Sequence, residues 1–197
     1  MAFEWLTGNS PQFWKNYVSL FDNETPYNKK RFVVFDVESS GLDWKEDNIL
    51  SIGGIGIVDG GIAIGDFMYA ALINPKQNNT ENSVVKAETE TVVEAEAMIQ
   101  LLNFIGDAIL VGNNINLDIE FINQALKRLD LGRLKNEVMD TSVLFKRWKG
   151  INDDDLKYTL DELCDGLKID KAERNSSWGN AYTTALVFIK LKAILKL

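Results

Sequence analysis

The chain has 197 residues, of which 46% are hydrophobic and 10% aromatic, enough to bury the core of one domain of ordinary size. Its formal net charge of −8 disfavours strong nonspecific binding to polyanions, although basic clusters or bound metal ions would still allow a nucleic-acid substrate. The single cysteine, Cys164, excludes an internal disulfide bond and suits a reducing compartment. Because no apolar run approaches about 18 residues and no secretory signal pattern opens the chain, we expect a cytoplasmic protein outside the membrane.

The N-terminal segment predicts an amphipathic helix followed by a polar linker. Phe13, Tyr17 and Leu20 recur at helical spacing behind a Ser-Pro start, and residues 22–30 are mostly polar. We therefore expect a leader helix and linker over residues 1–30, and one main domain over residues 31–197.

The next segment predicts a hydrophobic strand that carries two carboxylates, Asp36 and Glu38. Residues two apart in a strand point to the same face, so the carboxylates converge while Val33, Phe35 and Val37 pack the opposite face. Two carboxylates held together in a core strand repel each other unless a cation lies between them. The pair therefore indicates half of a divalent-metal site, unless the strand ends at Phe35 and both acids are solvated.

Two apolar runs follow, over residues 49–58 and 62–73, and the turn Asp59-Gly60-Gly61 joins them. This pattern predicts a β-hairpin, so the first three strands of the domain should be antiparallel. The polar residues 76–90 are expected to be mainly loop.

Thr91 with Glu94 three residues later predicts a capping box, opening a helix that ends at Gly106. The apolar positions expected on its inner face are Ala95, Met98, Leu102 and Ile105. A short buried strand is expected at 108–111. Asn116 is then the expected cap of a further helix, and Asp118 falls in the first turn of that helix, where an acid is also favoured by the helix dipole alone.

The C-terminal part predicts a strand near 137–139 and a helix from Thr141. Thr159 with Glu162 predicts a second capping box, and a long helix is expected from about residue 179 to residue 195. Hairpins first and strand–helix alternation later predict an α/β domain, with a mixed sheet flanked by helices.

Three segments together resemble the DnaQ-like, or DEDD, 3′–5′ exonucleases, which include the proofreading epsilon subunit of bacterial DNA polymerase III. They are Phe-Asp-Val-Glu-Ser-Ser-Gly-Leu at 35–42, Leu-Val-Gly-Asn-Asn-Ile-Asn-Leu-Asp at 110–118, and roughly the last 40 residues. The leader, with Phe13-Trp14-Lys15, also resembles the opening of Bacteroidetes-type members. The resemblance implies a ribonuclease H-like fold and two divalent ions, Mg²⁺ or Mn²⁺, held by acidic residues of three motifs.

Asp36 and Glu38 match the first of these motifs, and Asp118 matches the second. The third motif departs from the family pattern, because Asn175 stands at the expected histidine and Asn180 at the expected last aspartate. In this register the metal ligands would be the three carboxylates and Asn180, with Asn175 at the place of the general base.

A shifted register would put Trp178 and Thr183 at the two positions of the third motif. Asn113 also stands where the second motif commonly begins with histidine, and the whole chain contains no histidine. Trp178 is expected to fill the core, with a base-stacking platform as the alternative. Asp140, Asp161 and Asp165 are further acids in the region and are expected to be structural.

The two amides reduce the charge of the metal cage and remove a proton acceptor, so we expect the second ion to bind weakly. The leading hypothesis is a protein that binds single-stranded DNA or RNA 3′ ends, with hydrolysis weakened or lost. The alternatives are an active 3′–5′ exonuclease with a compensated third motif, and a non-enzymatic interaction module in replication or repair. The segment Asp36-Val-Glu38 also has a distant similarity to the haloacid-dehalogenase phosphatases. The hairpin that follows this segment fits that family poorly.

Overall fold

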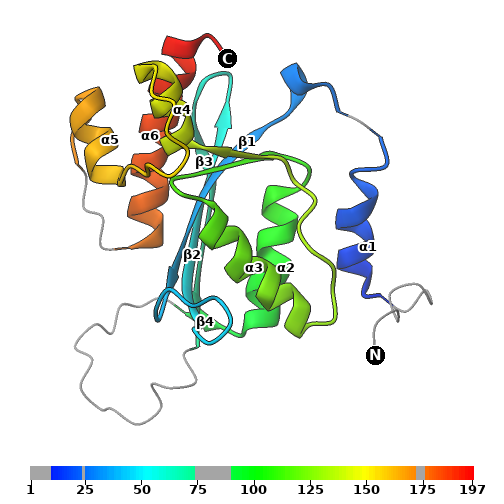
Figure 1. Ribbon diagram of the computed structural model, residues 1–197. Helices are drawn as coiled ribbons and strands as arrows, with labels where there is room; N and C mark the ends of the chain where they lie inside the picture. The colour runs from blue at the N-terminus through cyan, green and yellow to red at the C-terminus, as the bar shows by residue number, and fades with distance from the viewer. Residues whose placement is uncertain (1–9, 24, 74–89, 172–175) are drawn as a thin grey trace.

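The computed structural model describes residues 10–23, 25–73, 90–171 and 176–197, and a six-stranded mixed sheet forms its centre (Figure 1). The strands are β1 (Phe32–Ser39), β2 (Ile49–Val58), β3 (Gly61–Leu72), β4 (Thr91–Val92), β5 (Ile109–Gly112) and β6 (Val138–Asp140). Their order in the sheet is β4-β3-β2-β1-β5-β6. The first three strands are antiparallel, β4 is parallel to β3, and β5 and β6 run parallel to β1, which confirms the predicted mixed sheet.

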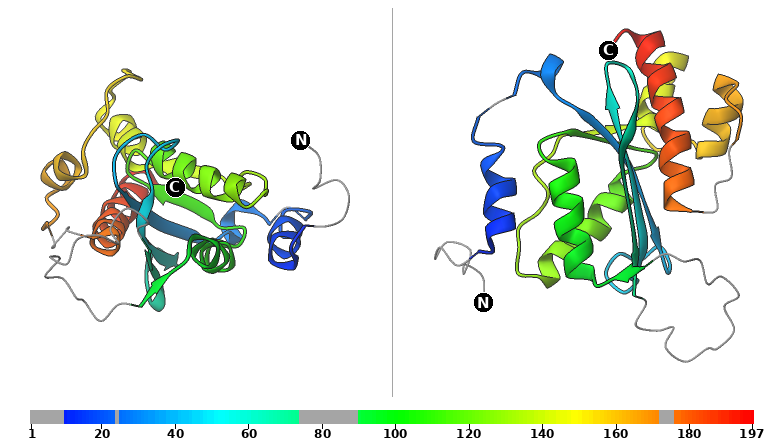
Figure 2. Two further views of the ribbon diagram at one scale, coloured as in Figure 1. Left: turned by 90° about the horizontal axis from the view of Figure 1, so that it is seen from below. Right: turned by 180° about the vertical axis from the view of Figure 1, so that it is seen from behind.

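Helices cover both faces of this sheet, as two further views show (Figure 2). They are α1 (Gln12–Ser19), the short 3₁₀ helix η2 (Tyr27–Lys29), α2 (Glu94–Ile105), α3 (Asn116–Arg128), α4 (Thr141–Lys149), α5 (Leu160–Leu167) and α6 (Ser177–Leu195). The helices α1, α2 and α3 lie on one face, and α4, α5 and α6 lie on the other. In the part of the chain that the structure describes, no helix combines the length and apolar character that a bilayer span requires.

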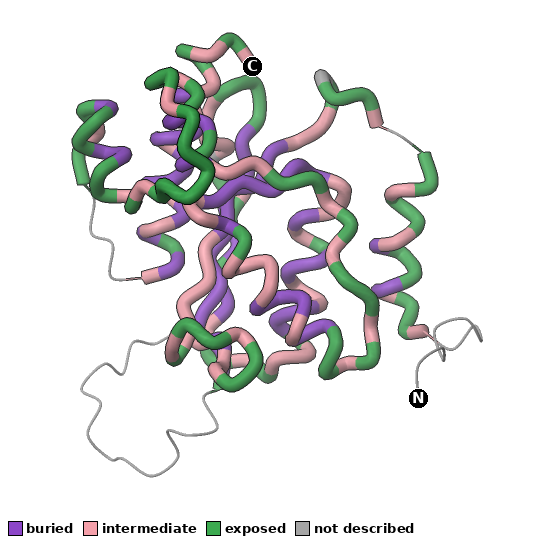
Figure 3. The backbone as a smooth tube through the Cα atoms, in the orientation of Figure 1, coloured by how far each residue is buried: buried purple, intermediate pink, exposed green. Residues whose placement is uncertain are grey.

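The alternation of β1 divides the buried residues into two cores. Val33 and Phe35 pack with the helices α1 to α3, whereas Phe32 and Val34 pack with α4 to α6. Val37 adds to the first core, as the period of two predicts. The buried segments in Figure 3 accordingly run along the central strands and along the inner sides of the helices.

The turn between β2 and β3 has the predicted hairpin geometry. Asp59 and Gly60 both have positive φ, at 51° and 78°. Two consecutive residues with positive φ characterise the type I′ turn, whose twist matches that of the flanking strands. The hairpin prediction is therefore confirmed, and the predicted loop at residues 76–90 lies outside the described residues except for Glu90.

The leader helix packs against the main body through residues that differ in part from the predicted ones. Tyr17 is buried in the same core as the helices α2 and α3, whereas the predicted Leu20 is 45% exposed. Trp14 is buried and its ring lies 5.3 Å from the Tyr17 ring. The helix begins at Gln12, and Trp14 and Tyr17, three residues apart on one face, form its buried stripe, with Phe13 packed beside it.

Of the two predicted capping boxes, one is confirmed and the other is wrong. The Thr159 side chain accepts from the Glu162 N–H at 3.3 Å, and the Glu162 carboxylate accepts from the Thr159 N–H at 2.7 Å. Thr91 instead pairs with Ala71 as part of β4, so α2 begins at Glu94 without a side-chain cap.

The predicted cap at Asn116 is also wrong, because α3 begins at that residue and its N-cap is Ile115. Asp118 nevertheless lies in the first turn of α3, and Gly106 ends α2, as predicted. The long C-terminal helix α6 begins two residues before the predicted position, at Ser177, and the Ser176 hydroxyl caps it by accepting from the Gly179 N–H at 3.1 Å. Cys164 is buried in α5 and free.

Candidate metal and nucleic-acid site

The two carboxylates of β1 share the face of the sheet that α6 covers. Asp36 and Glu38 continue the same alternation as Phe32 and Val34, which are buried in the core that includes α6. The strand extends through Ser39, so the alternative in which it ends at Phe35 is wrong. The structure therefore brings both acids to the inner side of α6.

A hydrogen bond to the side chain of Asn180 joins Asp36 to α6. The side-chain amide of Asn180 donates to the Asp36 carboxylate at 3.1 Å from Nδ2 to Oδ2. Burial, opposed by the Asn180 hydrogen bond and aided by the nearby Glu38 charge, raises the pKa of Asp36 to about 6. Without a cation, Asp36 therefore takes up a proton close to neutral pH.

Asp118 approaches the same place from the first turn of α3. Burial raises the pKa of Asp118 well above its usual value, and the charges of Asp36 and Asp140 raise it further. The backbone N–H of Val37 forms a hydrogen bond with this carboxylate and lowers the pKa in part. Asp118 and Asp36 thus interact as like charges across the end of β1.

These carboxylates supply the hard oxygen ligands that Mg²⁺ and Mn²⁺ prefer. Asp36 and Asp118 raise the cost of each other's ionisation, and a cation between them would relieve it. Among the described residues, however, no three acidic, histidine or cysteine side chains are grouped closely enough to hold a metal as they stand. The chemistry of these carboxylates therefore fits a divalent cation, although the side chains are not gathered around one in this structure.

The residue that faces Asp36 from α6 is Asn180, as the unshifted register of the third motif requires. Thr183, its counterpart in the shifted register, is fully buried and donates its hydroxyl to the Gly179 carbonyl at 2.9 Å. Asn175, the residue expected at the histidine position, lies outside the described residues.

Trp178 does not fill the core, so that prediction is wrong. Its side chain is 42% exposed, and its ring stacks on that of Tyr182 at 5.6 Å with an angle of 7° between the planes. The two residues are one helical turn apart on α6, so their rings form one continuous aromatic surface on that helix.

Asp140, which the sequence analysis expects to be structural, and Asn113, which stands where the second motif commonly begins with histidine, both make structural contacts. Asp140 caps α4 by accepting from the Ser142 N–H at 2.8 Å, and it also accepts from the Ile115 N–H at 3.1 Å. Asn113 donates to the Tyr158 carbonyl at 3.2 Å and accepts from the Thr141 hydroxyl at 3.0 Å. Its amide therefore joins β5 to α4, rather than reaching the carboxylates.

Two serines at the site were missed by sequence reasoning. The Ser51 hydroxyl on β2 donates to the Glu38 carboxylate at 2.6 Å and lies 2.8 Å from the Ser177 hydroxyl on α6. The available signal was a polar residue inside the apolar run that became β2, but its partner is 126 residues away along the chain.

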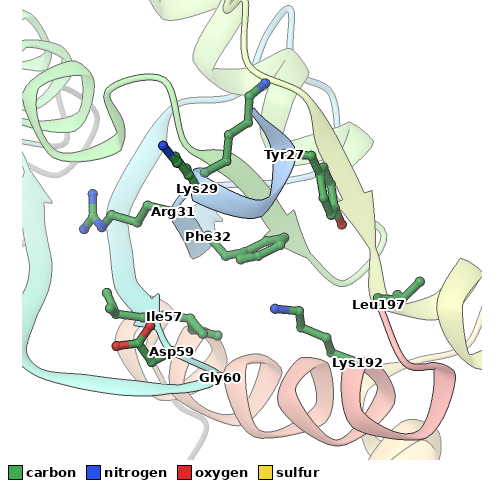
Figure 4. Close-up of a pocket in the computed structure, with 11 residues that line it drawn as sticks. Tyr27, Lys29, Arg31, Phe32, Ile57, Asp59, Gly60, Lys192 and Leu197 are labelled. Carbon is green, nitrogen blue, oxygen red and sulfur yellow. The ribbon is translucent and has the colours of Figure 1, made fainter. Parts of the chain in front are cut away.

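A cavity of about 800 Å³ lies at the opposite end of β1 and contains none of the site carboxylates (Figure 4). Basic side chains line it, but most are engaged with the protein itself. Lys30 pairs with Glu137, and the Lys192 ammonium lies 4.5 Å from the centre of the Phe32 ring. Arg31, also in its lining, pairs with an aspartate on β3.

Comparison with known proteins identifies the family. A family model described as RNase_T, Exonuclease, matches residues 33–188, and the chain belongs to this exonuclease family. The resemblance seen in the sequence motifs is thereby confirmed, and the ribonuclease H-like fold agrees with the solved structures below. Divalent-metal dependence is a property of this family.

Among curated proteins, an epsilon-like protein of DNA polymerase III from Rhodobacter capsulatus is 32% identical over 88% of this chain and 25% of its own length. The PolC-type DNA polymerase III of Thermotoga petrophila is 28% identical over 92% of this chain and 13% of its own length. The chain thus spans a quarter or less of these two relatives.

Among solved structures, E. coli exonuclease I in complex with a dT13 oligonucleotide superposes with a TM-score of 0.65 at 16% identity. This match covers 85% of the present chain and 42% of exonuclease I. The zinc-bound complex of the same enzyme with single-stranded DNA also gives a TM-score of 0.65 and 16% identity, over 84% of this chain and 41% of the enzyme.

Proposed function

We propose that this chain is a DnaQ-type 3′–5′ exonuclease domain that binds single-stranded nucleic-acid 3′ ends with weakened or lost hydrolysis. The observation that supports this most directly is the hydrogen bond from the Asn180 amide to Asp36. An amide N–H, rather than a carboxylate, faces the first metal-binding acid of β1. The proposed site keeps Asp36, Glu38 and Asp118 and has lost the negative charge of a fourth ligand.

The chemistry explains why this loss matters. When bound, a pair of Mg²⁺ or Mn²⁺ ions about 3.5–4 Å apart would activate water and stabilise the leaving oxygen of the phosphodiester. Asp36, Glu38 and Asp118 would hold one ion, and Asn180 could turn its amide to offer a neutral oxygen. Because a neutral oxygen does little to hold two dications together, the second ion would bind weakly.

The proton acceptor of the reaction is also affected. Asn175 stands at the place of the family's histidine, and an amide does not accept a proton near neutral pH. General acid–base catalysis typically contributes about 10²–10⁴-fold to the rate. Loss of this group together with the weaker second ion leaves binding as the better-supported activity.

The structural neighbours support the proposed substrate class. Their described complexes hold single-stranded DNA, and the same fold extends over most of this chain. The names of the relatives support a role beside a DNA polymerase, so we propose a replication or repair protein as the partner.

The test is release of nucleotides from a 3′-labelled single-stranded DNA oligonucleotide in Mg²⁺ or Mn²⁺. The unaltered chain would be compared with Asn180→Asp and with the double variant Asn175→His/Asn180→Asp, each paired with an Asp36→Ala control. We expect little release by the unaltered chain and a gain of at least about 10²-fold in the double variant.

Two other outcomes would replace this proposal. Rapid release by the unaltered chain that is lost in Asp36→Ala would identify an active exonuclease with a compensated third motif. A chain that binds neither oligonucleotide nor metal, and that no variant rescues, would favour a protein-interaction module.

A further inference from the structure

Two buried hydroxyls connect the Glu38 carboxylate to the first turn of α6. The Ser51 Oγ atom lies 2.6 Å from Glu38 Oε2 and 2.8 Å from Ser177 Oγ. Ser51 is 3% exposed and Ser177 is fully buried. Three elements, β1, β2 and α6, therefore meet in one short chain of hydrogen bonds.

The direction of these hydrogen bonds follows from proton counting. A serine hydroxyl carries one proton, and an ionised carboxylate only accepts. Since the Ser51 proton is donated to Glu38, the bond between the two serines has Ser177 as its donor. Both O–H dipoles then point toward Glu38, and hydrogen bonds aligned in a chain strengthen one another.

The same hydroxyls fix the position of α6. Asn180, which donates to Asp36, lies three residues after Ser177, so the two side chains are about one turn apart on the helix. Because Ser177 is hydrogen-bonded to β2 while Asn180 is hydrogen-bonded to β1, the first turn of α6 is held at two points on the sheet.

We infer that Ser51 and Ser177 act as positioning residues for the metal site, a role that rests on the function proposed above. The Ser51 hydroxyl donates to Glu38 Oε2, which leaves Oε1 to coordinate a cation. Ser177 donates to Ser51, and this bond fixes both the Ser51 hydroxyl and the first turn of α6. Neither residue touches the metal or substrate in this scheme. Both residues fix the positions of the Glu38 and Asn180 side chains before a cation binds.

The first test measures Mn²⁺ affinity directly, from the electron paramagnetic resonance signal of free Mn²⁺ during titration of the chain. Hydrogen-bond partners of metal ligands typically contribute about 10–100-fold to affinity. We expect Ser51→Ala and Ser177→Ala each to weaken Mn²⁺ binding about ten-fold, at the lower end of that range. Ser51→Thr, which keeps the hydroxyl, should bind Mn²⁺ nearly as the unaltered chain does.

The matched control is Ser39→Ala, which removes a strand hydroxyl one residue after Glu38. That hydroxyl donates its one proton to the Gly41 carbonyl at 2.5 Å and not to Glu38. Its removal should leave Mn²⁺ affinity unchanged. If Ser51→Ala and Ser177→Ala also leave the affinity unchanged, the inference is overturned.

A second readout needs no metal. The Asn180 backbone N–H donates to the Ser176 carbonyl at 3.0 Å, so its hydrogen exchange reports opening of the first turn of α6. Ser51→Ala, a change on β2, should speed this exchange about ten-fold, the change expected from losing about 1.4 kcal/mol of local stability, and Ser39→Ala should not.

Failure of the unaltered chain to bind Mn²⁺ would count against the proposed function alone. In that case unchanged exchange in Ser51→Ala would overturn the positioning role, and faster exchange would support it.

Discussion

Gly53 on β2 and Ser177 on α6 are in direct backbone contact, because a Cβ atom at Gly53 would lie 2.5 Å from the Ser177 carbonyl carbon. Backbone atoms cannot turn aside as a flexible side chain can. We therefore expect Gly53→Ala to push α6 away from β1 and to lower the free energy of unfolding by about 1–3 kcal/mol, as overpacking does. Thermal or urea denaturation of the purified variant would measure this loss.

Gly61→Ala provides the control for that substitution. A Cβ at Gly61 has only the Val58 carbonyl oxygen near it, at 4.0 Å, which is ordinary van der Waals distance. This variant should unfold within about 0.5 kcal/mol of the unaltered chain. Equal stability of the two variants would show that α6 does not rest on β2 as described.

A second prediction concerns the charge opposite Asp36. Asn180→Asp replaces an amide donor with a carboxylate beside Asp36, a buried acid that burial already disfavours in its charged form. Without metal the variant should lose about 1–3 kcal/mol of unfolding free energy at pH 7.5, through the lost hydrogen bond and the added repulsion.

Mn²⁺ should reverse the loss in Asn180→Asp, because an ion that binds only the folded state stabilises it by RT ln(1 + [L]/Kd). Melting temperature with and without millimolar Mn²⁺ is the measurement. If Asn180→Asp and the unaltered chain have the same melting temperature in EDTA, the Asn180 amide and Asp36 are not paired.

The acidic pair on β1 could be predicted from sequence because its information is local. A strand has a side-chain period of two, so Asp36 and Glu38 had to share a face once the apolar residues beside them formed a strand. The hydroxyl bridge could not be predicted in this way. It depends on a contact between Ser51 on β2 and Ser177 on α6, which are far apart in the sequence. No local sequence pattern predicts such a contact.

The two predicted capping boxes show the same limit within one motif. Thr159 is the N-cap of α5 and forms the reciprocal hydrogen bonds with Glu162, as the local pattern predicts. Thr91 pairs with Ala71 of β3 instead, which prevents it from capping α2. Tertiary pairing overrides the local signal there, and the sequence of the box alone does not reveal it.

The third prediction is a stability that falls as pH rises in the absence of metal. Burial raises the folded-state pKa of Asp36 from 3.8 to about 6, so between these values the folded chain binds more protons than the unfolded chain. Stability from this group is therefore fully present below about pH 4 and is lost as the pH rises through 6. The full loss is about 3 kcal/mol, and Asp118, whose pKa is also raised, acts in the same direction.

Asp36→Asn isolates this effect, because the amide is isosteric and does not titrate. Unfolding free energies at pH 5 and pH 7.5 in EDTA should differ more for the unaltered chain than for Asp36→Asn. Identical pH dependence in the two proteins would contradict the raised pKa of Asp36. Saturating Mn²⁺ should also flatten the profile of the unaltered chain, since the cation favours the ionised carboxylates.

The last prediction concerns the exposed aromatic surface on α6. Trp178 is 42% exposed and stacks on Tyr182, so its removal should cost little stability. If single-stranded DNA passes this surface, a base can stack there, and such stacking is worth about 1–3 kcal/mol per base. Trp178→Ala should then weaken binding of a fluorescent oligothymidylate about five-fold or more, with melting temperature nearly unchanged.

The control is Tyr27→Ala, which removes another exposed ring, 49% exposed, from the far end of β1. Equal binding by both variants would exclude Trp178 as a stacking platform, whereas a selective loss that grows weaker at high salt would place the strand across the start of α6.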